Sequence, residues 1–174
     1  LHIMDKEQEF PKRKTTRLKD FDYSTTGAYF ITINTQDRKS ILSRIVSGGE
    51  DGPFPYLSPR GKIAEKWIQD IPNKYQDVTV DRYVIMADHV HLLISISHND
   101  GRGDPSPTVS MVVGWLKHQI TKEINKNLGT TGEKIFQRSF YDHIIRNYED
   151  YCEVHKYIHE NPIRRYYSDL LPEK

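Results

Sequence analysis

The chain has one cysteine, Cys152, and no internal repeat or long apolar run among its 174 residues. A single cysteine excludes an internal disulfide and a cysteine-built zinc site, so we expect a reducing cytosol. No run approaches the ~20 apolar residues that a membrane helix needs, and no secretory signal stands at the start. The net charge of +1 gives no global sign of a nucleic-acid binder. With 36% hydrophobic and 28% charged residues, the chain is expected to form one polar globular domain.

A basic segment, KRKTTRLK at 12–19, is the local candidate for a nucleic-acid contact. Lys12, Arg13, Lys14 and Arg17 could bind DNA phosphates, because phosphate neutralisation dominates affinity for DNA. A solvated arm without a specific partner explains the composition equally well. We therefore predict a basic N-terminal arm over 1–19, a folded domain over 20–165 and a C-terminal tail over 166–174.

The hydrophobic pattern predicts four strands and three helices. The strands are expected at 28–36, 77–86, 89–96 and 134–145. One helix is expected to start at Ser58-Pro59 and to stop at Pro72. A second has apolar residues from Val112 to Leu128 and stops at Gly129. A third runs from Tyr148 to Glu160, with Asn147 before it and Pro162 after it. The segments 45–59 and 97–107 are expected to be loop and linker.

The order of these elements predicts the fold class. The two strands joined by Ala87-Asp88 must form a hairpin, because two residues leave no room for a crossover. The order β-α-β-β-α-β then gives an α+β fold, a ferredoxin-like antiparallel sheet with one further helix at the C-terminal end. That fold hosts many functions, so the function has to come from particular residues.

His89 and His91 lie in an otherwise apolar strand, MADHVHLLI at 86–94. Residues i and i+2 of a strand face the same side, about 7 Å apart along the chain. Two imidazoles so placed can bind one ion with ligand bonds of roughly 2 Å. A pair of surface histidines is the alternative, but the surrounding apolar residues weigh against it, since a buried imidazole needs partners for its ring nitrogens. A further metal ligand would have to come from elsewhere.

The last predicted helix contains KYIHENP at 156–162, in which Tyr157 and Asn161 lie one turn apart. Both lie on or beside the apolar stripe marked by Val154 and Ile158, so both can point at whatever the helix covers. Asn161 offers a hard carbonyl oxygen that suits Mg²⁺ or Mn²⁺. By residue type alone, a packing tyrosine and a helix-ending asparagine explain the pair as well.

Two segments resemble motifs of one family. VIMADHVHLLI (84–94) resembles the HUH motif (histidine, hydrophobic residue, histidine) of single-tyrosine transposases, and YIHENP (157–162) resembles the catalytic-helix motif of their REP-associated branch, the REP-associated tyrosine transposases. Supporting similarities lie before and between these two motifs, in the order that the family has them. They are DYSTTGAYFITINTQDR (22–38), LSPRGKIAEKWIQDIP (57–72), VVGWLKHQITKEIN (112–125) and IFQRSFYDHIIRN (135–147). The resemblance covers the chain from about Tyr23 to Pro162.

The resemblance implies roles for four residues. The metal-binding histidines fall on His89 and His91, the helical amide that completes the metal site on Asn161, and the nucleophile on Tyr157. Many insertion-sequence relatives have glutamine in place of Asn161, so the chain is more similar to the REP-associated branch. Ala87 departs from the proline usual in the family, and the residues after 162 match less well.

The family also implies a reaction. Its members use a divalent ion, Mg²⁺ or Mn²⁺, to cut single-stranded DNA, often beside a hairpin. A phenol with a pKa near 10 is a weak nucleophile, so the ion would polarise the phosphate that Tyr157 attacks. The products would be a 5′-phosphotyrosine and a free 3′-OH, and the reverse step rejoins the strand. We expect an enzyme of DNA transposition, acting as a monomer or homodimer in a prokaryotic cytoplasm, at the nucleoid.

Two further cations are candidate DNA contacts. Arg138 and Arg146 flank the strand FYDHII and could hold phosphates, although surface arginines often have no specific role. His143 in the same strand is expected to have a structural hydrogen bond.

Other tyrosines and other functions are weaker alternatives. Tyr141, Tyr148 and Tyr151 are less suited than Tyr157 to be the nucleophile because they point elsewhere. A non-catalytic module that binds structured single strands, derived from a transposase, is the first alternative function. A metal-dependent hydrolase that activates water is the second, and it would not need Tyr157.

Overall fold

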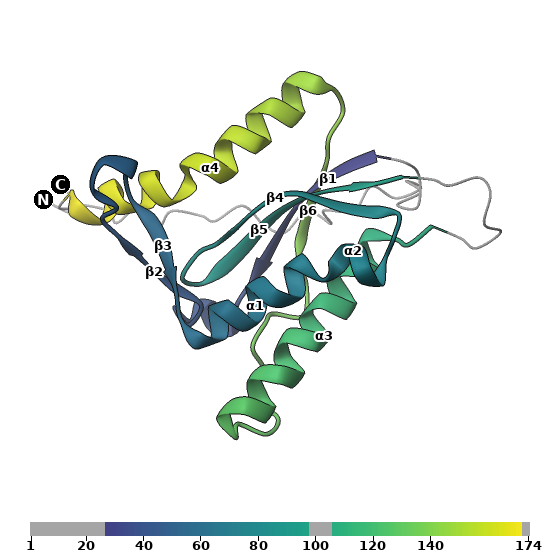
Figure 1. Cartoon of the computed structure of the whole chain (residues 1–174), viewed down its shortest axis with the longest axis horizontal. Coiled ribbons are helices and arrows are strands. Elements are labelled where there is room, and N and C mark those ends of the chain that lie inside the picture. Colours follow the sequence, from purple (N-terminus) through teal and green to yellow (C-terminus); the bar gives the residue numbers. More distant parts are fainter. Residues whose placement is uncertain (1–26, 98–105, 172–174) are drawn as a thin grey trace, which may run out of the picture.

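A computed structural model describes residues 27–97 and 106–171, and within them the main sheet has four antiparallel strands. Their order is β4-β5-β1-β6, formed by β1 (Gly27–Asn34), β4 (Val78–Ile85), β5 (His89–Ile96) and β6 (Tyr141–Ile144). Helices α1 (Pro59–Gln69), α2 (Ile71–Lys74) and α3 (Val109–Leu128) cover one face, and α4 (Tyr148–Leu170) crosses the other (Figure 1). The chain order β1-α1-β4-β5-α3-β6, followed by α4, confirms the predicted ferredoxin-like arrangement.

The two faces of the sheet differ because side chains alternate along each strand. One set packs under α1 and α3 into the main core, including Ile31 and Ile33 of β1 with Val90, Leu92 and Ile94 of β5. The opposite set faces α4. There only a small apolar cluster forms, from Val84, Met86, Leu93 and Ile158. The histidines of β5 belong to this second, more polar face.

The helices begin and end where local capping predicts. Ser58 accepts a hydrogen bond from the Gly61 N–H at 3.1 Å and caps α1. Gly129 ends α3 with a φ of 65°, which suits a residue without Cβ. Asn147 accepts from the Asp150 N–H at 2.8 Å and caps α4. These three predicted boundaries are confirmed.

Helix α4 buries little of its surface, and polar contacts hold it to the sheet. Only Ile158 and Pro162 of its residues are buried. Arg82 of β4 donates to Nε2 of His155 at 3.1 Å and to Nδ1 of His159 at 2.8 Å. The register of β4 shifts immediately before Arg82, and such bulges re-aim side chains. A single guanidinium thus links β4 to two successive turns of α4.

The predicted end of the last helix at Pro162 is wrong. Helix α4 continues through this proline to Leu170 and includes the first part of the tail predicted over 166–174. Proline removes one backbone donor but its side chain is buried here, and the next turns contain the ion pairs Arg164–Glu160 at 2.8 Å and Arg165–Asp169 at 3.1 Å. Packing outweighs the local cost of the proline.

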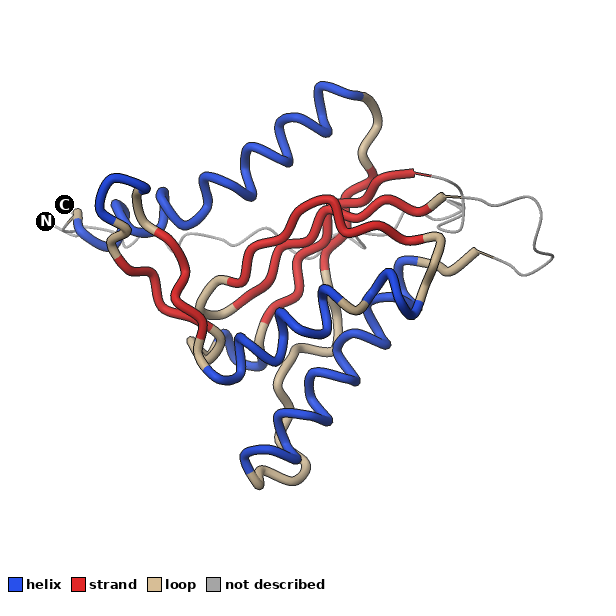
Figure 2. Tube along the Cα trace, viewed as in Figure 1, coloured by secondary structure: helices blue, strands red, loops and turns tan. Residues whose placement is uncertain are grey.

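The predicted loop over 45–59 is also wrong, because most of it forms a hairpin. Strands β2 (Ser43–Val46) and β3 (Phe54–Leu57) pair antiparallel, and the turn between them contains glycines with positive φ at 49 and 52. The hairpin leans from one end of the main sheet to the C-terminal end of α4, which it contacts (Figure 2). The strand predicted over 134–145 is shorter, β6, with an isolated bridge between Thr35 and Phe136 before it.

Two predicted segments are not placed. The basic arm over 1–19 and most of the linker over 97–107 lie outside the described residues. Among the helices that are described, none is long and apolar enough to cross a membrane.

Candidate active site

His89 and His91 lie side by side on the face of β5 that α4 covers. Their ring centroids are 4.6 Å apart. His89 pairs with Asn34 of β1 and His91 pairs with Thr32 of β1, so the register between β1 and β5 fixes the position of both histidine backbones. His91 is only 5% exposed, which excludes the alternative of two surface histidines for this residue. The i, i+2 spacing therefore produces the convergent pair that it predicts.

The ring nitrogens nearest the backbone are already in use. Nδ1 of His89 donates to the Asp88 carboxylate at 2.6 Å, and Nδ1 of His91 lies 2.9 Å from the Thr32 hydroxyl. The second Asp88 oxygen pairs with Arg38 at 2.9 Å, and Arg38 also donates to the Asn34 amide oxygen. This leaves Nε2 of each ring available to bind an ion, and contacts of this kind at Nδ1 are typical of histidines that bind metals.

Both imidazoles are neutral at pH 7. Burial, followed by the nearby His89 ring and the charge of Arg38, lowers the pKa of His91 to about 3. Burial also lowers the pKa of His89, assisted by the positive charges of Arg38 and Arg165 and opposed by Asp88. A neutral imidazole is the form that binds a metal ion.

Tyr157 of α4 lies beside this pair, and Asn161, one turn further along α4, lines the same cavity. The Tyr157 ring lies 5.4 Å from the His91 ring, and Phe30 touches both at 5.1 Å from His91 and 5.8 Å from Tyr157. Tyr157 is 38% exposed, so its hydroxyl is accessible to a large substrate. Arg164 stands with its guanidinium carbon 6.0 Å from the centre of the Tyr157 ring.

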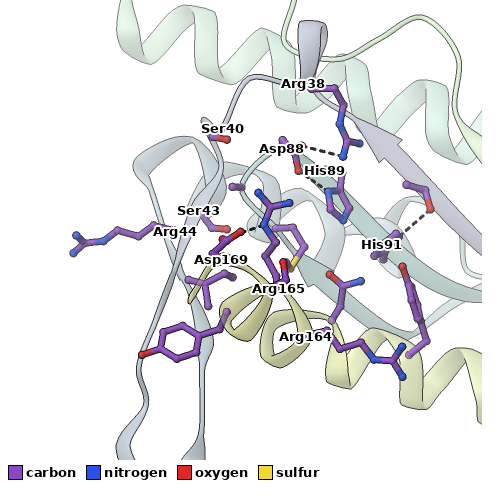
Figure 3. A pocket seen from close by; sticks show the side chains of 18 of the residues that line it. Arg38, Ser40, Ser43, Arg44, Asp88, His89, His91, Arg164, Arg165 and Asp169 are labelled. Atoms are coloured by element: carbon purple, nitrogen blue, oxygen red, sulfur yellow. Dashed lines mark hydrogen bonds and ion pairs between the residues drawn. The ribbon is translucent and has the colours of Figure 1, made fainter. Parts of the chain in front are cut away.

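All four predicted site residues line one cavity of 840 Å³, between the sheet, β2 and the second half of α4 (Figure 3). Figure 3 shows Asp88 and Arg38 beside His89, and Arg165 reaching into the same space from α4. The structure therefore brings His89, His91, Tyr157 and Asn161 together, although β5 and α4 are far apart in the sequence.

The donor set fits a hard or borderline divalent ion. Two neutral imidazoles present Nε2, and Asn161 offers an amide oxygen in the same cavity. Within residues 27–97 and 106–171, no cluster of three or more histidine, cysteine or acidic side chains could hold an ion instead. A site built here needs the amide, and leaves coordination positions for a substrate.

The predicted DNA contacts are not gathered at this cavity. Arg138 and Arg146 are exposed and do not line it, and Lys12, Arg13, Lys14 and Arg17 lie outside the described residues.

The other candidates from β6 and α4 lie away from the cavity as well. His143 is 2.9 Å from the Asp150 carboxylate at the start of α4, in keeping with the structural role predicted for it. Tyr141, Tyr148 and Tyr151 do not line the cavity either.

Sequence reasoning missed the four arginines that do line it, Arg38, Arg44, Arg164 and Arg165. The last two follow Asn161 at i+3 and i+4, so a helix continued through Pro162 would have placed them. Arg44 depends on the hairpin that was not predicted. Arg38 has a φ of 54°, a left-handed conformation that non-glycine residues rarely adopt and that no residue pattern announces.

Comparisons with known proteins agree on one family. The family model described as "Transposase IS200 like" matches residues 58–161. Two curated relatives come from Haemophilus influenzae. One, without an assigned function, is 28% identical over an alignment of 166 residues, which covers 87% of this chain and 88% of the relative. The other, described as a candidate REP-associated tyrosine transposase, is 27% identical over 161 residues, with 87% and 79% covered.

Two solved structures share the fold. A REP-associated tyrosine transposase bound to a REP hairpin superposes with a TM-score of 0.56 at 21% identity, covering 86% of this chain and 74% of that one. A candidate transposase of Deinococcus radiodurans gives a TM-score of 0.50 at 14% identity, with 83% and 95% covered. At these identities the likeness concerns the fold.

Proposed function

Because the chain belongs to the IS200-like transposase family, whose function is DNA transposition, we propose that it cuts and rejoins single-stranded DNA with Tyr157 as the nucleophile. The observation that carries this proposal is the convergence of Tyr157 and Asn161 on His89 and His91 in one cavity. A tyrosine beside two neutral histidines and an amide is the set of groups that metal-assisted phosphoryl transfer to a phenol needs.

His89, His91 and Asn161 would hold the divalent ion, Mg²⁺ or Mn²⁺, through two imidazole nitrogens and one amide oxygen. When bound, such an ion polarises a phosphate and stabilises negative charge on its oxygens. Asp88 and Thr32 keep the rings in place through Nδ1, so Nε2 stays directed at the cavity. Because His89, His91 and Asn161 are uncharged ligands, they would leave the positive charge of a bound ion unneutralised, which would favour an anionic substrate.

The phenol oxygen of Tyr157 attacks the phosphorus, and the bond to the 3′ oxygen breaks. The phenol loses its proton, and the departing oxygen gains one to become the 3′-OH. The 5′ phosphate stays on Tyr157 as a phosphodiester, so the number of phosphodiester bonds is unchanged and the strand can be resealed by the reverse step. Arg164 beside the phenol ring would stabilise charge on the transferred phosphate.

The substrate we propose is a single strand that carries a hairpin. The support is the relative of the same fold that was solved bound to a REP hairpin.

The test is a covalent adduct. Incubation with hairpin-bearing single strands from around the gene and with Mg²⁺ or Mn²⁺ should give a protein–DNA adduct that survives denaturant. Tyr157→Phe should abolish the adduct, and Tyr148→Phe should not, because Tyr148 is 81% exposed on the same helix and away from the cavity. An adduct that persists in Tyr157→Phe would show that another residue is the nucleophile.

The metal ligands have a separate test. His89→Ala and His91→Ala should lose the adduct while binding the same DNA, because they remove ligand atoms and leave the cavity arginines in place. Cleavage unchanged in both variants would reject the metal site. Binding by the wild-type protein without any adduct, over a range of hairpins and both ions, would favour the non-catalytic alternative.

A further inference from the structure

The cavity continues along α4 beyond Tyr157, and its far section has no role in the chemistry above. Tyr157, Asn161, Arg165 and Ser168 all line it, and spacings of four, four and three residues put them on one stripe of the helix. At a rise of 1.5 Å per residue, Arg165 lies about 12 Å along the axis from Tyr157. The wall thus extends two turns past the nucleophile, to the level where α4 meets β2.

The lining of the cavity is electropositive. Four arginines face two aspartates, and the histidines are neutral, so the excess is two positive charges. The charged residues are Arg38, Arg44, Arg164, Arg165, Asp88 and Asp169. A concave surface with one sign of charge concentrates ligands of the opposite sign.

Two of the arginines already have a role, and two are available. Arg38 is held by Asp88, and Arg164 beside the Tyr157 ring is the residue proposed to stabilise charge on the transferred phosphate. Arg165 pairs only with Asp169 among the described residues, at 3.1 Å, and both side chains are more than half exposed. Such pairs contribute little and exchange easily for a better anion.

Arg44 is the other available cation. Among the described residues it forms no ion pair, and its guanidinium carbon lies 5.2 Å from the Tyr56 ring centre. In Figure 3, Arg165 lies toward His89, while Arg44 extends outward from β2 at the edge of the cavity. Both line the same cavity, Arg165 from α4 and Arg44 from β2.

We propose that Arg165 and Arg44 form a phosphate track for the DNA strand next to the cleaved bond. The proposal rests on the proposed function, because it places the scissile phosphate at Tyr157. A stacked strand rises about 3.4 Å per nucleotide, so 12 Å puts Arg165 about three to four nucleotides from that phosphate. Guanidinium groups bind phosphates through two parallel hydrogen bonds, and half-buried Tyr166 in the same wall offers a ring to a base.

Binding can be tested without cleavage, in the Tyr157→Phe protein. The probe is a fluorescently labelled DNA hairpin with mixed-sequence single-stranded tails, followed by anisotropy over a range of salt. Arg165→Gln and Arg44→Gln should each weaken binding about tenfold, as expected for a lost hydrogen bond to a charged group. Each should also reduce the slope of log K against log salt by about 0.7. The matched control is Lys62→Gln on α1, exposed on the opposite face of the sheet. Slopes equal to that control would overturn the track.

A second arm locates the contact. On a strand whose cleaved bond has been mapped by the adduct, single phosphates within about four nucleotides of that bond are replaced by uncharged methylphosphonates. One replacement should weaken wild-type binding and have no further effect in Arg165→Gln. Equal losses in both proteins at every position would refute the contact.

The two proposals fail in different ways. If no adduct forms but the arginine variants change the salt slope, the cleavage proposal fails, and Arg165 and Arg44 are phosphate contacts of a strand that is bound without being cut. If the adduct forms and the slopes are unchanged, only the track fails.

Discussion

Replacing Asp88 by asparagine should weaken divalent-metal binding without disturbing the fold. One carboxylate oxygen accepts the Nδ1–H of His89 at 2.6 Å and the other pairs with Arg38 at 2.9 Å. An amide has one acceptor oxygen and one NH₂ group. Either His89 loses its acceptor, or Arg38 faces a donor, so His89 can no longer be held as it is.

The size of the effect follows from what Asp88 contacts. A carboxylate that orients a metal-binding histidine typically contributes a factor of about 10 to 100 in metal affinity, or about 1.4–2.8 kcal/mol. Asp88 is 17% exposed and its Arg38 partner 49% exposed, so the ion pair itself adds little to stability. The backbone carbonyl of Asp88 accepts hydrogen bonds from the Thr35 N–H at 3.0 Å and from the Thr35 hydroxyl at 2.9 Å, and the substitution does not change it. The loss should therefore appear in metal affinity and not in the unfolding midpoint.

Calorimetric titration with Mn²⁺ in the absence of DNA measures this directly. The matched control is Asp37→Asn, which removes the same charge one residue from Arg38. Asp37 is exposed and has a φ of 56°, a conformation that asparagine tolerates well. If Asp88→Asn binds Mn²⁺ as tightly as the control, then Asp88 does not orient a metal ligand and the reasoning from the His89 contact fails.

Three further predictions concern stability and the attachment of α4. Gly61→Ala would bring a Cβ to 2.0 Å from the Leu42 carbonyl oxygen and should destabilise the protein by about 2 kcal/mol. At Gly114 a Cβ would have nothing within 4 Å, so Gly114→Ala should stabilise the protein by about 1 kcal/mol. Urea unfolding that gives free-energy changes of the same sign for both variants would contradict this. In metal-free protein, the pKa of about 3 for His91 means that only the unfolded chain takes up its proton between pH 6.5 and 3. Stability should therefore fall by up to about 1.4 kcal/mol per unit as pH drops through that window, and less steeply in His91→Gln. Arg82→Met removes both hydrogen bonds from β4 to α4. Because the nucleophile is then misplaced, adduct formation should slow by about tenfold to a hundredfold while DNA affinity stays constant. An unchanged rate would show that apolar packing alone positions the helix.

The parts of the fold that sequence alone predicts are those set by local chemistry. Ser58, Asn147 and Gly129 mark helix ends because each satisfies backbone groups within three or four residues of itself. The histidine pair follows from strand periodicity, which puts His89 and His91 on one face in any sheet. The β2–β3 hairpin was missed because its glycines and prolines, typical of loops, stand in the turn and in a two-stranded ribbon that has no core to give it an alternating pattern.

The far half of the cavity could not be predicted because it depends on one competition between local and tertiary forces. A proline inside a helix costs about 3 kcal/mol when nothing compensates it. Pro162 is one of the buried residues of α4, and we attribute the continuity of the helix to Leu170 to that packing. Only then do Arg164 and Arg165 fall on the same stripe as Tyr157. The residues after 162, which resemble the family least, are therefore the ones that α4 carries along the far wall of the cavity, and differences there would change how a bound strand is held while leaving His89, His91, Tyr157 and Asn161 in place.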